Sequence, residues 1–263
     1  MAREWDSAAY HRLSDPQFGW ALKVLGKLDV QRIPGNAHIL DAGCGTGRVT
    51  AELLRRLPHC RVIAVDASEN MVRQARLTLE EFGDRVQIQQ CDLLEIPYCE
   101  TFDLVFSTAV FHWIKDHDRL FAALFRALKR GGAMLAQCGG GPNLKKVRDR
   151  AQQLISTEPF QRYFQSWDKV WEYPGPELTA ERLRHAGFDD VSTSLEAAPV
   201  TFSDAAQYRE FLRTVILHPY LERLPEPLQI DLIERMVRQG AQEHPAFVLD
   251  YWRLNMQGHK TAQ

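Results

Sequence analysis

Apolar runs alternate with amphipathic stretches through the first half of the chain. Mostly apolar runs stand at residues 38–42, 61–65 and 102–106, and each leads into a polar or glycine-containing turn. Between such runs, apolar residues return at helical spacing, as at Leu120 and Leu124. Continuous apolar strands that alternate with helices are typical of a parallel sheet covered by helices on both faces. The pattern predicts a doubly wound α/β fold.

The second half of the chain is expected to complete this sheet. Residues 190–202 and 247–257 are predicted as the last two strands, which pair as an antiparallel hairpin at the edge. The helix after the fourth strand is expected to run through Lys129 and Arg130 and to stop at the glycines that follow. The predicted domains are an N-terminal helical lid (1–34), a core (35–203 and 244–263) and a helical insertion that forms part of the substrate cap (204–243).

The turn after the first apolar run carries the strongest chemical signal. Asp41 is followed by Gly43, Gly45 and Gly47, so a strand turns sharply into a helix. Glycine accepts positive φ and lets the backbone approach a ligand, while the helix start presents unpaired N–H groups. A nicotinamide-binding turn would require GxGxxG, but Arg48 stands where its last glycine would be. The turn therefore predicts a cofactor site, and it disfavours a nicotinamide oxidoreductase.

Acidic residues end the next two predicted strands. An apolar run leads into Asp66, and the alternating segment at residues 86–93 leads into Asp92. Ligands of doubly wound folds bind at the carboxyl ends of the strands, where the carboxylate of Asp66 can accept both hydroxyls of a ribose. Each acid also has an alternative role without a ligand. Asp66, with Ser68, could cap the start of the next helix, and Asp92 could be an ordinary polar loop residue.

The string DAGCGTG at residues 41–47 closely resembles the first motif of class I S-adenosylmethionine-dependent methyltransferases. Trp5, Tyr10, the segment FHWIKDHDRLF and the helical insertion extend the resemblance to the trans-aconitate methyltransferase group, over nearly the whole chain. It implies a Rossmann-like, mostly parallel seven-stranded sheet with an antiparallel last strand, and a loop that wraps the methionine portion of S-adenosylmethionine. The cofactor contacts expected on this basis are Asp41, Gly43, Cys44, Gly45, Thr46, Gly47, Asp66, Ala67, Met71, Asp92, Leu93, Thr108, Trp5 and Tyr10.

Candidate acceptor contacts are His112, Trp113, His218 and Tyr220. His112 follows the fourth strand and is the candidate catalytic base, although a histidine that only hydrogen bonds backbone or cofactor is an equal alternative. The resembled group carries LRPWL in its insertion, where this chain has LHPYL, so His218 replaces an arginine expected to meet a substrate carboxylate. Histidine is a weaker, pH-dependent anion partner, which weakens the case for a tricarboxylate acceptor.

The composition of the chain limits the kinds of partner that it is expected to bind. The net charge is −2, and the basic residues are scattered, which argues against nucleic acid binding. No run of eighteen apolar residues exists, so neither a membrane partner nor a location outside the cytoplasm is expected. The five cysteines lack metal-ligand spacing; a triple-thiol site at Cys44, Cys91 and Cys138 is conceivable, but buried packing is favoured, and no metal is expected.

The sequence thus indicates an S-adenosylmethionine-dependent enzyme that methylates oxygen or carbon of a small molecule, with a carboxylate among the candidates. It is expected to act as a monomer or homodimer. The alternative is a non-catalytic cofactor-binding module with a protein partner. The predicted lid, loop and insertion disfavour this alternative, because a mere binder needs no second pocket.

Overall fold

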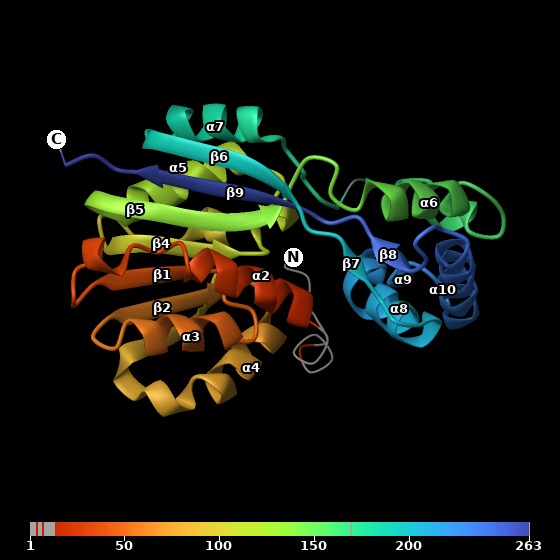
Figure 1. Ribbon diagram of the computed structural model, residues 1–263, viewed down its shortest axis with the longest axis horizontal. Helices are drawn as coiled ribbons and strands as arrows, with labels where there is room; N and C mark the ends of the chain where they lie inside the picture. The colour runs from red at the N-terminus through yellow and green to blue at the C-terminus, as the bar shows by residue number, and fades with distance from the viewer. Residues whose placement is uncertain (1–3, 5–6, 8–13, 169, 263) are drawn as a thin grey trace. The chain divides into compact units, whose positions relative to one another are not determined.

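The computed structural model describes residues 4, 7, 14–168 and 170–262 (Figure 1). Two compact units make up the chain. Residues 1–141, 172–196 and 254–263 form one, which we call the sheet unit, and residues 142–171 and 197–253 form the other, the helical unit. The chain therefore passes from the sheet unit to the helical unit twice.

The sheet unit is built on a seven-stranded sheet of order β3-β2-β1-β4-β5-β9-β6 (Figure 1). Its strands are β1 (His38–Ala42), β2 (Arg61–Asp66), β3 (Val86–Gln90), β4 (Phe102–Thr108), β5 (Leu128–Gly139), β6 (Asp189–Ala197) and β9 (Trp252–His259). Pairs β1–β2, β1–β4, β2–β3 and β4–β5 are parallel. Strand β9 runs opposite to β5, and Lys260 just beyond it exchanges backbone hydrogen bonds with Gly131 and Gly132. The predicted mostly parallel sheet with one antiparallel strand is confirmed.

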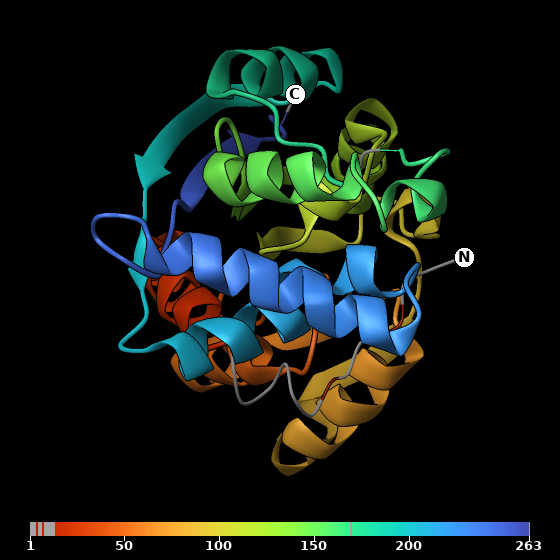
Figure 2. The ribbon, with the colours of Figure 1, turned by 90° about the vertical axis from the view of Figure 1, so that its right-hand side faces the viewer.

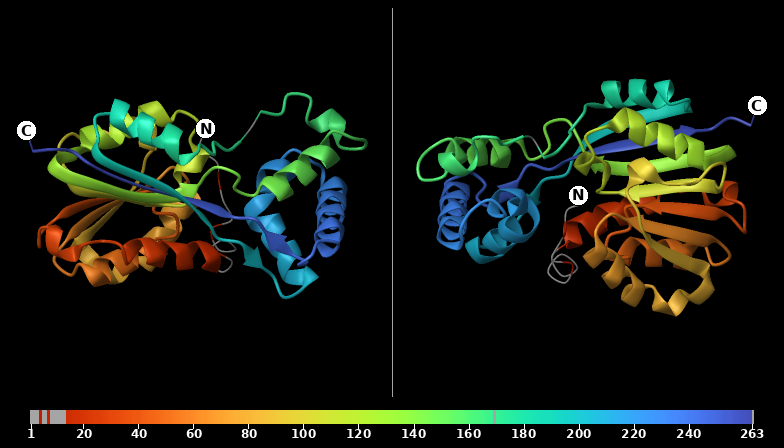
Figure 3. Two further views of the ribbon diagram at one scale, coloured as in Figure 1. Left: turned by 45° about the horizontal axis from the view of Figure 1, so that its top comes forward. Right: turned by 180° about the vertical axis from the view of Figure 1, so that it is seen from behind.

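Helices cover both faces of this sheet (Figure 3). They are α2 (Asp15–Leu25), α3 (Arg48–Arg56), α4 (Glu69–Thr78), α5 (His117–Ala127) and α7 (Pro176–His185). Ile39 of β1 joins an apolar cluster with residues of α2, α3 and α4, whereas its neighbour Leu40 joins a second cluster with α5 and α7. Successive strand residues point to opposite faces, which explains why both Ile39 and Leu40 are apolar.

The helix after β4 ends earlier than the sequence predicts. Helix α5 stops at Ala127, and Leu128 already pairs with Phe102 as the first residue of β5. Lys129, predicted to end the helix, instead places its Nζ 2.8 Å from Asp103 Oδ2. Strand pairing and this ion pair override the helical spacing of the sequence.

The helical unit holds α6 (Lys145–Ile155), α8 (Ala205–Phe211), a π-helical turn (Leu212–Ile216), α9 (His218–Leu221) and α10 (Glu226–Ala241). Helix α10 packs against α6 and α8 (Figure 2). A two-stranded antiparallel sheet of β7 (Val200–Thr201) and β8 (Val248–Leu249) completes the unit. Residues 204–243 lie within it, but so does the segment 142–171, which the sequence analysis assigned to the core.

The two strands predicted at residues 190–202 and 247–257 are each interrupted. The first divides into β6 and β7 around Pro199, which has no N–H to donate to a ladder. The second divides into β8 and β9, because the backbone between them is diverted: Leu144 N–H donates to the Asp250 carbonyl, and Trp252 N–H donates to Asn143 Oδ1 over 2.8 Å. Each predicted strand thus contributes to both sheets.

Candidate functional site

The loop between β1 and α3 turns on three glycines. Gly43, Gly45 and Gly47 have φ of +87°, +54° and +82°, a backbone region that other residues rarely adopt. Gly47 precedes the first helical residue of α3, and its N–H donates to the Cys44 carbonyl over 3.0 Å. The spacing of the glycines therefore follows from the backbone of a tight strand-to-helix turn.

The three glycines differ in what surrounds them. A Cβ added to Gly43 would lie 2.2 Å from Val110 Cγ2, and one added to Gly47 would lie 3.0 Å from Leu79 Cγ. A Cβ on Gly45 would meet nothing within 4 Å. Gly43 and Gly47 thus permit close packing inside the protein, whereas Gly45 presents bare backbone to open space. Such a surface fits a cofactor laid against the loop, as the sequence analysis expects for S-adenosylmethionine.

Asp66, the last residue of β2, is bonded to this loop. Its Oδ2 accepts the Gly45 N–H and its Oδ1 accepts the Ser68 N–H, both over 2.9 Å. Burial raises the pKa of Asp66, partly offset by these backbone hydrogen bonds. Each carboxylate oxygen has two lone pairs, so this geometry leaves acceptor capacity for ribose hydroxyls. The cap of α4 is Ser68, whose Oγ accepts the Met71 N–H, so Asp66 does not serve as that cap.

Asp41 lies inside the protein at the end of β1. Its side chain is buried, with the residue 2% exposed, and its Oδ2 accepts a hydrogen bond from Thr50 Oγ1 over 2.5 Å. Burial raises the pKa of Asp41 to about 7, against the opposing effect of the Thr50 hydrogen bond. This carboxyl can therefore gain or lose a proton near neutral pH, which the sequence alone does not reveal.

The other expected cofactor contacts lie at or just beyond the same ends of β1, β2, β3 and β4, or begin the helices after them. Ala67 follows Asp66, and its carbonyl accepts a hydrogen bond from Gln90 Nε2 over 3.2 Å. Asp92 is exposed, and its Oδ1 accepts the Leu94 N–H over 2.9 Å, so it caps a short 3₁₀ turn. Cys44, Thr46, Met71 and Leu93 are buried, and Thr108 ends β4. Their contact with a cofactor stays a prediction.

His112 lies in a 3₁₀ turn after β4, where its residue is 8% exposed. Its Nδ1 accepts the backbone N–H of Gly139 over 3.3 Å, and its ring stacks on Tyr173 with centroids 5.6 Å apart. An Nδ1 that accepts a hydrogen bond places the proton of a neutral imidazole on Nε2. In that form the ring offers a donor at Nε2, so the geometry favours the hydrogen-bonding alternative over the general base. Trp113 packs beside His112 with ring centroids 5.2 Å apart.

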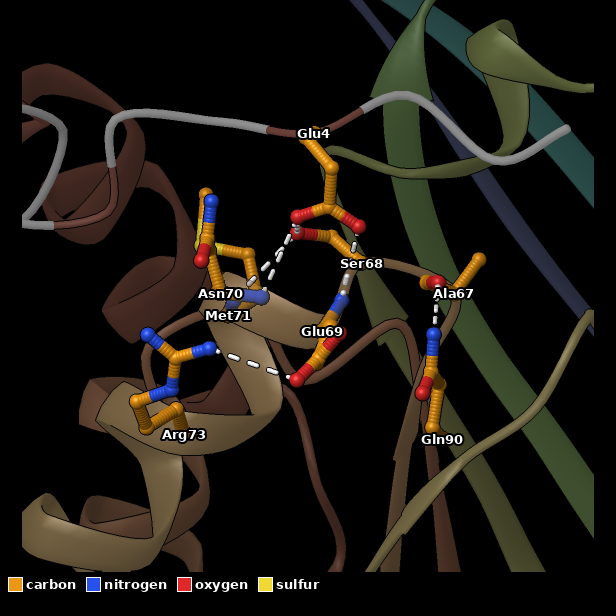
Figure 4. Close-up of polar contacts among 8 residues, drawn as sticks. All are labelled: Glu4, Ala67, Ser68, Glu69, Asn70, Met71, Arg73 and Gln90. Carbon is orange, nitrogen blue, oxygen red and sulfur yellow. Dashed lines mark hydrogen bonds and ion pairs between the residues drawn. The ribbon is translucent and has the colours of Figure 1, made fainter.

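Two functional candidates escaped the sequence analysis. Tyr173 belongs to the sheet unit and stacks on His112, from which it is distant in the chain. Glu4 bonds the start of α4 (Figure 4), and no sequence pattern marks it because its partners are distant in the chain. The expected contacts Trp5 and Tyr10 lie outside the described residues.

The remaining acceptor candidates belong to the helical unit. Tyr220 is 3% exposed and stacks on Trp167 with ring centroids 4.8 Å apart. Burial raises the pKa of Tyr220 to about 12, so it stays a neutral phenol at physiological pH. His218 Nδ1 lies 3.4 Å from Glu222 Oε1, one helical turn further on. A protonated His218 would therefore share its charge with a carboxylate of its own chain.

The cysteines form no cluster in the part of the chain that the structure describes. Cys44 and Cys138 are buried, Cys91 is half-buried, and all are free thiols. Burial raises the pKa of the Cys44 and Cys91 thiols, which keeps them protonated and poorly reactive. Within the described residues, no three His, Cys, Asp or Glu side chains are grouped to hold a metal ion.

Comparison with known proteins bears on this site. Residues 39–132, which include the glycine loop, Asp66, Asp92 and His112, match the family described as "Methyltransferase domain". The chain is 27% identical over 252 residues to the trans-aconitate 2-methyltransferase of Variovorax paradoxus, covering 92% of this chain and 91% of that protein. It is 29% identical to the protein of the same name from Azoarcus sp., covering 94% and 87%.

Solved structures with the same fold are named for different acceptors. Phosphoethanolamine N-methyltransferase 2 of Haemonchus contortus, in complex with S-adenosyl-L-methionine, superposes with a TM-score of 0.63 at 21% identity, over 97% of this chain and 56% of that chain. This chain therefore spans little more than half of that protein. Geranyl diphosphate C-methyltransferase of Streptomyces coelicolor gives a TM-score of 0.55 at 14% identity, over 92% and 77%. These likenesses establish the fold and leave the acceptor open.

Proposed function

We propose, from the premise that this chain is an S-adenosylmethionine-dependent methyltransferase, that it methylates a carboxylate oxygen of a small organic acid. The observation that carries the proposal is the similarity to trans-aconitate 2-methyltransferases over 84–94% of the chain. It spans both units, so it includes the segment 204–243 that we assign to the substrate cap. A non-catalytic binding module is disfavoured for the same reason.

S-adenosylmethionine, when bound, supplies an electrophilic methyl group on a positively charged sulfur. We assign its binding to the bare backbone at Gly45, the Asp66 carboxylate and the exposed Asp92. The half-buried Asp66 carboxylate complements the positive charge of the cofactor, since electrostatic interactions are stronger away from bulk water. Displacement at the methyl carbon requires the acceptor oxygen to approach opposite the sulfur, at about 3–3.5 Å. The chain's main task is therefore to position the acceptor.

The arrangement at His112 supports a carboxylate acceptor. A carboxylate is already ionised at neutral pH, so its methylation needs no general base. An imidazole whose Nδ1 is engaged by Gly139 offers an Nε2 proton, which suits an oxygen anion better than a protonated acceptor. We therefore assign His112 as a hydrogen-bond donor to the acceptor.

The residue at position 218 argues for an acid with fewer charges than a tricarboxylate. His218 replaces the arginine of the resembled group, and Glu222 lies 3.4 Å from its Nδ1. A site with less positive charge favours a mono- or dicarboxylic acid. We therefore expect such acids to be better acceptors than trans-aconitate.

The test is the chemical nature of the product. The protein is incubated with methyl-labelled S-adenosylmethionine and trans-aconitate, or with mono- and dicarboxylic acids of similar size, and the product is treated with mild alkali. A methyl ester releases labelled methanol, whereas methyl groups on carbon, nitrogen or an ether oxygen stay attached. Alkali-labile label supports the proposal. Alkali-stable label, or no transfer to any of these acids, would overturn the carboxylate assignment.

A further inference from the structure

Glu4 makes a long-range contact beside the proposed cofactor site (Figure 4). Its Oε2 accepts from Ser68 Oγ over 3.0 Å and from the Asn70 N–H over 3.2 Å, and its Oε1 accepts from the Glu69 N–H over 3.0 Å. The chain separation between Glu4 and Ser68 is 64 residues. One carboxylate thus takes three hydrogen bonds from the start of α4.

This contact is more than α4 requires for its own stability. Ser68 already caps the helix through its bond with the Met71 N–H, and Glu69 supplies an acidic side chain to the first turn. These local features meet the usual requirements of a helix start. The Glu4 bonds therefore point to a second effect, which is to fix residue 4 at this place.

The bonds of Glu4 continue to the glycine loop. Ser68, which donates to Glu4 through Oγ, donates its backbone N–H to Asp66 Oδ1, and Asp66 Oδ2 accepts the Gly45 N–H. The negative charge of Glu4 also acts on Asp66 and contributes to raising its pKa. Glu4 is therefore linked to Asp66, the residue assigned to bind the ribose, both through hydrogen bonds and through its charge.

The carboxylate of Glu4 is ionised under ordinary conditions. Burial raises the pKa of Glu4, but the bonds from Asn70, Glu69 and Ser68, with the charge of Arg73, outweigh it and hold the pKa below its usual value. The carboxylate consequently stays charged throughout the neutral range, so its capacity to accept these hydrogen bonds does not change there.

We infer that Glu4 is a positioning residue for the cofactor: its hydrogen bonds hold residue 4 at the start of α4, beside the turn at residues 66–68, and slow cofactor dissociation. The inference rests on the cofactor site proposed at Asp66, and it is independent of the acceptor. Losing these hydrogen bonds frees residue 4 and releases one constraint on Asp66. The expected consequence is faster dissociation of the cofactor from a protein that is equally stable.

The test compares Glu4→Gln with Glu69→Gln. Both variants remove one negative charge at the start of α4, but only the first removes the carboxylate that bonds residue 4 to this helix. Dissociation of S-adenosylhomocysteine is followed by stopped-flow fluorescence, with the Tm of each variant as the measure of stability. We expect Glu4→Gln to raise the dissociation rate at least fivefold and Glu69→Gln to change it less than twofold, with both Tm values unchanged.

Turnover provides the second measurement. Glu4→Gln should raise KM for S-adenosylmethionine and leave kcat unchanged, because the residue positions the cofactor and does not touch the reacting atoms. When Ser68→Ala is already present, Glu4→Gln should raise KM by a smaller factor, since the hydrogen bond between Ser68 Oγ and Glu4 is already lost. Equal dissociation rates for the wild type and Glu4→Gln, or equal changes in both charge variants, would overturn the inference. Because dissociation is measured without an acceptor, an incorrect acceptor class would not alter this result.

Discussion

The backbone N–H of Gly139, at the end of β5, donates to Nδ1 of His112, which follows β4. Neighbouring parallel strands thus bring together a backbone donor and an imidazole that are 27 residues apart in the chain. The hydrogen bond selects the tautomer with the proton on Nε2. If a backbone carbonyl stood at Nδ1 in place of the Gly139 N–H, the free lone pair would lie on Nε2 and His112 could act as a base. The backbone partner at Nδ1 therefore decides whether Nε2 donates or accepts a proton.

His112→Gln should therefore retain more activity than His112→Asn. The glutamine amide can present an N–H near the position of Nε2, whereas the asparagine amide reaches only the position of Nδ1. Both variants should bind S-adenosylhomocysteine with near-normal affinity by calorimetry, and kcat should fall at least tenfold further in His112→Asn. Full activity in both variants would remove His112 from the reaction.

The pH profile separates the two roles of His112 in the wild type. A donor that binds a carboxylate through Nε2–H works in both the neutral and the protonated imidazole, so kcat/KM should show no loss below neutral pH that His112→Gln removes. A general base would lose activity as the imidazole takes up its proton. If kcat/KM of the wild type falls below neutral pH and that of His112→Gln does not, His112 would again be assigned as a general base.

Asp66→Ala should weaken binding of S-adenosylmethionine tenfold or more. The loss corresponds to one charge-assisted hydrogen bond, about 1.5–3 kcal/mol, and the variant also frees the N–H groups of Gly45 and Ser68. Calorimetric titration measures the change. The matched comparison is the affinity of Asp92→Ala, which also removes a carboxylate that follows a strand. Asp92 is exposed, and its carboxylate bonds only one described backbone N–H, that of Leu94. Unaltered affinity in Asp66→Ala would contradict the ribose assignment.

Much of this site is predictable from the sequence, because it is built from local signals. The glycine loop, the acids at strand ends and the apolar strands all depend on residues close together in the chain, and the sheet confirms their order. The end of α5 is not predictable in this way, since Leu128 leaves the helical pattern only to pair with Phe102. Glu4 and Tyr173 likewise act through distant partners.

Buried Asp41 should make stability depend on pH. Its pKa rises from 3.8 to about 7 in the folded protein, so the native state holds a proton that the unfolded chain has lost. The free energy of unfolding should therefore decrease as pH rises from about 4 to about 7, and then level off. The full effect is on the order of 4 kcal/mol. Asparagine at position 41 cannot titrate, so Asp41→Asn is the control. Urea unfolding should show that the free energy of unfolding of the wild type decreases relative to that of Asp41→Asn between about pH 4 and about pH 7. Parallel profiles would contradict the shifted pKa.

Position 218 tests the acceptor preference. His218→Arg restores the residue of the resembled group and adds a permanent charge beside Glu222. It should lower KM for trans-aconitate severalfold and leave kcat largely unchanged, because the residue would bind a carboxylate away from the methyl group. His218→Ala should raise KM for anionic acceptors modestly. If neither variant changes KM for any acid, His218 contributes only to packing in the helical unit.

Gly43→Ala and Gly45→Ala separate the structural glycines from the binding glycine. Both positions have positive φ, which costs alanine about 1–2 kcal/mol. At Gly43 the new Cβ would also lie 2.2 Å from Val110 Cγ2, so overpacking should bring the loss of stability to about 2–5 kcal/mol. At Gly45 the Cβ meets no protein atom within 4 Å, so the loss of stability should stay near the smaller value. If the cofactor lies against this backbone, Gly45→Ala should lose most of its affinity for S-adenosylhomocysteine, although urea unfolding should show it losing less stability than Gly43→Ala. Normal affinity in Gly45→Ala would place the cofactor elsewhere.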